Sequence, residues 1–143
     1  MKLSKSFDLS EFLISQEAVR RNIDNTPSPE QIECLQSLCV NILQPVRDYF
    51  NSPVIITSGY RNPVVNKLVG GSSHSQHCNG QAVDFTVAGQ SLLSVAKYIR
   101  ENLLYDQLIY EFDSWIHVSY SNSNRKQLLT INAGGAINGI KGI

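Results

Sequence analysis

Apolar residues recur at helical spacing over residues 28–50, the first long patterned segment of the chain. This pattern predicts the main core helix. Its inward-facing positions are Ile32, Leu35, Leu38, Cys39, Ile42, Leu43 and Val46. Ser28 and Gln31 fit a capping box at its start, with Pro29 at the first helical position. Pro45 is expected to kink the helix or restart its last turn.

Shorter patterned segments predict the remaining elements. Residues 7–23 and 62–71 carry short helical patterns, and residues 91–103 form an amphipathic helical pattern. Apolar runs predict strands over residues 54–57, 82–87, 107–112, 115–120 and 126–131. Because helices come first and strands are grouped later, we expect an α+β fold: a central antiparallel sheet with helices packed on it.

The chain is expected to form one domain over residues 1–143. This length is close to the modal domain size, and no repeat, low-complexity tract or long linker divides the sequence. Residues 1–27 are expected to form an N-terminal helical extension. Residues 133–143 carry four glycines and are expected to be a loosely held tail.

Composition and charge argue against several classes of partner. Lys plus Arg number 12 and Asp plus Glu also number 12, so the formal net charge is zero. This balance argues against a nucleic-acid-binding or membrane-surface protein. No apolar run reaches the roughly 18 residues of a membrane helix. No apolar stretch follows residues 1–8, so we expect no signal peptide, and an odd number of cysteines favours free thiols in a protein made in the cytoplasm.

Two histidines and one aspartate form the candidate reactive centre. His77 lies in a polar loop, and Asp84 follows in a strand where an unpaired carboxylate would be costly and needs a cation. His117 lies in a later hairpin, beside the strand that carries Glu111. Two imidazoles and a carboxylate suit a catalytic zinc ion with an open fourth position, and neighbouring transition metals accept the same ligands. A lone histidine in a strand is more often a satisfied core residue, so spacing alone leaves both interpretations open.

Three motifs in the right order resemble one known family. Residues 75–84 read Ser-x-His-x-x-Gly-x-Ala-x-Asp, which resembles the signature of the zinc D-alanyl-D-alanine peptidases. Residues 58–66 resemble the Ser-Gly-Tyr-Arg-x-Pro-x-x-Asn block of that family, and residues 115–119 resemble its final ligand strand. The family includes carboxypeptidases, dipeptidases and phage endolysins, and it shares its fold with the hedgehog signalling domain. The resemblance spans residues 35–120.

The resemblance implies a zinc ion held by His77, Asp84 and His117. The dipeptidases place a general base, a glutamate, three residues before the last histidine, where this chain has a serine at position 114. The hedgehog-like arrangement places an acid six residues before it, which is Glu111 here. Asp113 is the second candidate, and we prefer Glu111 because it projects from a strand rather than from a turn.

Further site residues follow from the same resemblance. Arg61 is expected to stabilise an oxyanion or grip a substrate carboxylate. Ser75 is expected to hydrogen-bond the substrate, with a loop-stabilising hydroxyl as the alternative. Trp115 stands where some relatives carry a histidine, and it is expected to line the cleft or to pack in the fold.

The resemblance implies a zinc metallopeptidase that cleaves peptidoglycan stem peptides at bonds involving D-amino acids, as a carboxypeptidase or an endopeptidase. Small single-domain relatives are commonly phage-encoded, so action on the cell wall after lysis or delivery in a phage particle is expected. The alternative is a catalytically weak or inactive module of the same fold that binds cell wall or serves as a phage structural component. Ser114 and Trp115 favour this alternative, and Glu111 favours the enzyme. The sequence does not indicate an oligomeric state.

Overall fold

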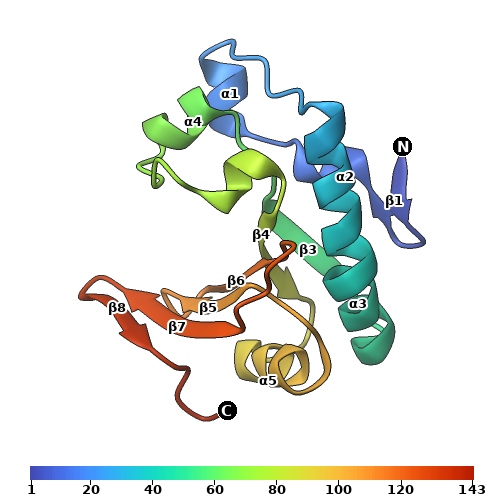
Figure 1. Cartoon of the computed structure of the whole chain (residues 1–143), viewed down its shortest axis with the longest axis vertical. Helices are drawn as coiled ribbons and strands as arrows, with labels where there is room; N and C mark the ends of the chain where they lie inside the picture. The colour runs from blue at the N-terminus through green and yellow to red at the C-terminus, as the bar shows by residue number, and fades with distance from the viewer.

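A six-stranded sheet forms the centre of the computed structural model, which describes residues 1–143 (Figure 1). The strand order is β3-β4-β6-β5-β7-β8, and the fold is α+β as expected. The strands are β3 (Val54–Ser58), β4 (Ala82–Val87), β5 (Gln107–Glu111), β6 (Trp115–Ser119), β7 (Gln127–Asn132) and β8 (Gly135–Asn138).

The sheet is antiparallel except at one pair of strands. β5 and β7 run parallel, with Glu111 paired to Ile131. The expected antiparallel sheet thus has one parallel pair, because residues 120–126 carry the chain from the end of β6 past the start of β5. Elsewhere the register sets side chains opposite one another: Asp84 on β4 and Ile109 on β5 both pair with His117 on β6.

The long predicted helix forms in three parts. These are α2 (Pro29–Leu38), a π-helical turn η2 (Cys39–Leu43) and α3 (Gln44–Phe50). The capping box is present: Gln31 N donates to Ser28 Oγ at 3.2 Å, and Ser28 N donates to Gln31 Oε1 at 2.8 Å. Pro45 cannot donate a backbone hydrogen bond, and the wider π turn immediately before α3 accommodates it without ending the helix.

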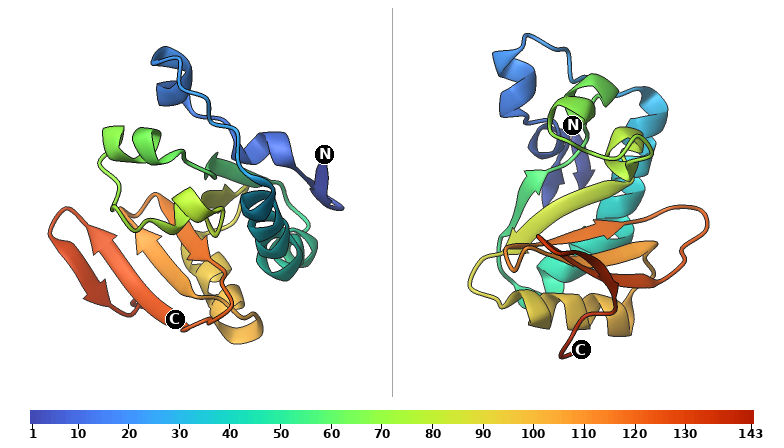
Figure 2. Two further views of the ribbon diagram at one scale, coloured as in Figure 1. Left: turned by 45° about the horizontal axis from the view of Figure 1, so that its top comes forward. Right: turned by 90° about the vertical axis from the view of Figure 1, so that its left-hand side faces the viewer.

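Helices cover one face of the sheet, and the other face is left for the site. α5 (Leu92–Asn102) and the α2–α3 helix pack on the face that carries Val83, Phe85, Leu108, Ile116 and Val118, which are all fully buried. Side chains alternate along each strand, so the neighbouring positions point to the opposite face. That face is approached by α4 (Pro63–Leu68) and the 3-10 turn η3 (Gln76–Asn79), as Figure 2 shows.

Both ends of the chain differ from the expectation. Residues 1–27 begin with a small hairpin, β1 (Lys2–Ser4) and β2 (Phe7–Asp8), before η1 (Leu9–Phe12) and α1 (Gln16–Arg20). Phe7 and Phe12 are buried in the main core, so this segment is part of the domain. The expected loose tail instead contains β8, which pairs with β7, and the buried Ile140. Backbone pairing with β7 and the buried side chain of Ile140 order this glycine-rich segment.

The structure contains no helix with the length and apolar character that crossing a bilayer requires.

Candidate metal centre

His77, Asp84 and His117 converge at the open face of the sheet. One ligand atom from each lies within 4.8 Å of the others. His117 Nδ1 is 2.9 Å from Asp84 Oδ1, and His77 Nε2 is 3.4 Å from the same oxygen. Asp84 and His117 are cross-strand partners, which fixes their proximity, whereas His77 reaches them from η3.

The loop around His77 presents one ring nitrogen to the centre. Its Nδ1 lies 2.8 Å from the carbonyl of Gly59, which leaves the buried Nε2 facing Asp84. Burial lowers the pKa of His77, so the ring is neutral near pH 7. Donation from Nδ1 to the carbonyl then places the lone pair on Nε2, which is what a metal ligand requires. Gly59 itself is needed because a Cβ there would lie 2.5 Å from the carbonyl oxygen of Phe12.

Asp84 supplies the negative charge of the centre. Burial opposes its ionisation, but the contacts with His117 and His77 outweigh that cost and hold the pKa of Asp84 far below its usual range. The three side chains therefore offer two imidazole nitrogens and one carboxylate oxygen. This donor set fits a catalytic zinc ion, which takes three such protein ligands and keeps one position open.

Glu111 lies beside the ligands, and Asp113 does not. Glu111 Oε1 is 3.5 Å from His117 Nδ1, and its side chain is half-buried. Burial and the charge of Asp84 both raise the pKa of Glu111. Asp113 is exposed in the turn between β5 and β6, where Phe112 and Asp113 have φ of 53° and 52°. Of the two candidate bases, the structure brings only Glu111 to the metal centre.

A cleft of about 680 Å³ opens over these residues. It is lined by all three ligands and Glu111, and also by residues from distant parts of the chain: Arg61, Ser75, Gln107, Trp115, Arg125 and Ile131. A second cavity of about 470 Å³ adjoins it, shares Arg61 and Asp84, and is walled by α1 on its far side. The centre thus lies where two neighbouring cavities meet.

The other expected site residues all line the cleft. Arg61 has a buried Nε with no partner, and Trp115 has a buried Nε1 with none. Ser75 Oγ accepts a hydrogen bond from His77 N at 3.2 Å and caps η3. A loop-stabilising contact of Ser75 is therefore present, and its contact with substrate stays a prediction.

The sequence interpretation did not identify Arg125, a charged residue of the cleft wall. Arg125 lines the cleft and is held by Asp106, a buried acid just before β5. An acid directly preceding an apolar strand was the available signal, because a carboxylate at such a place needs a cation. Its partner lies 19 residues away in a loop, where no local pattern points to it.

Comparison with known families agrees with this geometry. The family model described as Peptidase M15 matches residues 5–119, which contain all three ligands and Glu111. No curated protein matches the sequence. The matched segment is most of the chain and carries a His-Asp-His group that could hold the metal of a zinc-dependent peptidase. The protein belongs to the peptidase M15 family.

Proposed function

We propose that the protein is a zinc-dependent peptidase that hydrolyses peptidoglycan stem-peptide bonds involving D-amino acids. The observation that carries this proposal is the position of Glu111, a half-buried carboxylate 3.5 Å from the ligand His117 at the floor of an open cleft. A carboxylate at this place is within reach of a water molecule bound beside the ligands.

The chain's own residues supply the proton transfers. A metal ion held by His77, Asp84 and His117 would act as a Lewis acid towards water and the scissile carbonyl. Glu111 accepts the proton of the attacking water and passes it to the leaving amine, so one carboxylate serves as base and then as acid. Its raised pKa suits this dual use, because a carboxylate with a higher pKa is a stronger base towards the attacking water and, once protonated, can still donate to the leaving amine.

Arg61 stabilises the negative charge that develops on the substrate during the reaction. Its backbone N donates to the carbonyl of His77 at 3.1 Å, which ties it to the ligand loop. Its guanidinium lines the cleft, where it binds the oxyanion of the tetrahedral intermediate. The D-amino-acid substrate class rests on the resemblance of residues 58–66 and 75–84 to the D-alanyl-D-alanine peptidases.

The second candidate is a module of the same fold that binds cell wall, or builds a phage particle, without cleaving it. It is favoured by Ser114, which replaces the glutamate of the dipeptidases. Trp115 also favours it, because the indole fills the position of a histidine and its Nε1 has no partner.

Release of new amino groups from purified peptidoglycan tests the two candidates. We expect release by the zinc-loaded protein, loss of release with a chelator, and recovery when zinc is returned. Synthetic peptides that contain D-Ala-D-Ala or L-Ala-L-Ala then test the substrate class, and only the former should be cleaved. A zinc-loaded protein that binds peptidoglycan and releases nothing would establish the binding module instead.

A further inference from the structure

Arg125 lies in the metal cleft although it comes from outside the segment that matches the family model. It lines the cleft together with His77, Asp84 and His117. The family match ends at residue 119, before the loop that carries Arg125. This part of the cleft wall therefore lies outside the matched segment and is not explained by the metal centre.

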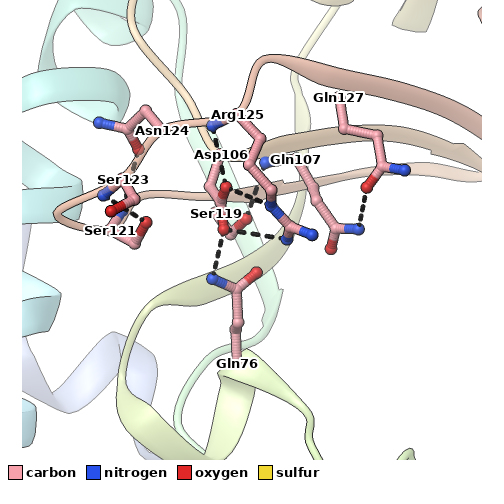
Figure 3. Close-up of polar contacts among 9 residues, drawn as sticks. All are labelled: Gln76, Asp106, Gln107, Ser119, Ser121, Ser123, Asn124, Arg125 and Gln127. Atoms are coloured by element: carbon pink, nitrogen blue, oxygen red, sulfur yellow. Dashed lines mark hydrogen bonds and ion pairs between the residues drawn. The ribbon is translucent and has the colours of Figure 1, made fainter.

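Asp106 fixes the guanidinium in one orientation. Arg125 Nε donates to Asp106 Oδ1 at 2.7 Å, and Nη2 donates to Oδ2 at 3.1 Å (Figure 3). The backbone N of Arg125 also donates to Oδ1, at 3.0 Å, and Gln76 Nε2 donates to Oδ2 at 2.8 Å. Asp106 is only 3% exposed, so the acid acts as a buried anchor whose acceptors are all used.

The loop that carries Arg125 is also held by its own hydrogen bonds. Ser121 N donates to Asn124 Oδ1 at 2.9 Å, and Ser123 N donates to Ser121 Oγ at 3.1 Å. Lys126 N donates to the carbonyl of Tyr105 at 3.1 Å. These contacts remove freedom from the loop before any ligand binds, so little entropy is lost when Arg125 takes a ligand.

One edge of the guanidinium is left for a ligand. Nη1 makes no hydrogen bond within the protein, and Figure 3 shows it pointing away from Asp106. The side chain of Arg125 is 56% exposed, whereas the side chain of Asp106, taken without its backbone, is 5% exposed. A guanidinium anchored on one side and open on the other presents fixed N–H donors, and these donors match the oxygens of a carboxylate.

We propose that Arg125 forms a carboxylate-binding subsite of the cleft and that it selects peptides by a carboxylate group. This inference rests on the proposed function, because the carboxylate belongs to the bound peptide. Asp106 acts through Arg125 as a positioning residue. Because Asp106 already balances the charge of Arg125, the subsite recognises its ligand by directed hydrogen bonds. Arg61 lies between the two cavities and serves a different part of the substrate.

Binding of matched peptides to the zinc-loaded protein tests the subsite, by calorimetry and without need of turnover. One pair of peptides differs by a C-terminal carboxylate or carboxamide, and a second pair differs by a Glu or Gln side chain. We expect the wild type to bind the acid of at least one pair about 10- to 100-fold more tightly than its amide. The pair that shows the preference identifies the source of the carboxylate.

Arg125→Met should abolish that preference, whereas the matched control Lys126→Met should keep it, because Lys126 carries the same charge on the same loop and does not line the cleft. If loss of Arg125 leaves Asp106 buried without a cation and unfolds the protein, the double variant Arg125→Met/Asp106→Asn removes both charges and is used instead. The proposal is overturned if the wild type shows no preference in either pair, or if the variant lacking Arg125 keeps it. If the zinc-loaded wild type prefers the acid peptide but hydrolyses no peptidoglycan, the result counts against the proposed function and not against the subsite.

Discussion

Glu111 and Asp113 are two residues apart in sequence, yet the backbone gives them different surroundings. Glu111 is the last residue of β5, and its side chain reaches His117. Asp113 follows in a left-handed turn and is exposed. The difference arises because β5 ends at Glu111 and the left-handed turn carries Asp113 away from the sheet. Asp84 and His117 lie together because they are cross-strand partners. The roles of these residues stay predictions.

Replacing Glu111 with Gln should lower kcat by about 10²- to 10⁴-fold while the metal content stays the same, because the amide cannot accept a proton. Steady-state kinetics on a D-amino-acid peptide and metal analysis of the same samples measure both. Asp113→Asn is the matched control and should keep wild-type rates. The role of Glu111 as base would be excluded by an E111Q variant that hydrolyses at the wild-type rate with zinc bound.

The candidate metal centre could be predicted from the sequence, whereas the part of the cleft wall that Arg125 forms could not. His77, Asp84 and His117 were accessible because a short motif and strand alternation place them. Arg125 reaches the cleft only through the path of residues 120–126 and the parallel pairing of β7 with β5. Both depend on packing between distant segments, which a local pattern does not encode.

At the scale of elements, strands and the long helix were predicted more accurately than the ends of the chain. β4 has the predicted bounds, since its apolar alternation is strong. The helix around Pro45 continues through a π turn, whose extra backbone room leaves no sequence pattern. The tail was misjudged because composition suggested disorder, whereas β8 is ordered by backbone hydrogen bonds to β7.

Asp106 joins three elements, so its removal should weaken their contact. It binds the residue before His77, the Arg125 loop and, through its backbone N, the carbonyl of Ser119 at 2.8 Å. Asp106→Asn should reduce the free energy of unfolding by about 1.5–3 kcal/mol at pH 7, the range for hydrogen bonds to a charged group. Urea denaturation measures the change, and Asp48→Asn on exposed α3 is a control expected to change stability little.

The difference in free energy of unfolding between the wild type and Asp106→Asn should also depend on pH. Hydrogen bonds from Arg125 hold the pKa of Asp106 below its ordinary value. A group with a lowered folded-state pKa contributes stability above its unfolded pKa, about 3.9, and this contribution is lost as pH falls through the folded value. The wild type should therefore exceed Asp106→Asn in free energy of unfolding by the full amount at pH 6–7, and this difference should shrink below about pH 4. An advantage that grows on acidification would contradict this assignment.

At the scale of the molecule, the metal centre joins loop and sheet. His77 comes from η3, whereas Asp84 and His117 come from the sheet, so an ion bound between them holds both parts together. A ligand that binds only the folded state stabilises it by about 2.7 kcal/mol at 100 times its Kd. Zinc at that excess should raise Tm by about 5–10 °C, as scanning calorimetry measures. Asp84→Asn should lose most of this shift, and an unchanged shift in that variant would place the bound zinc elsewhere.

The parallel pairing of β7 with β5 has a consequence for how variation can be divided along the chain. The three candidate ligands and Glu111 all precede residue 120, whereas Arg125 lies in the loop that leads into β7. β7 covers the outer edge of β5 and contributes none of the candidate ligands. Changes in the segment that follows β6 can therefore alter the wall of the cleft without altering the residues that would hold the ion.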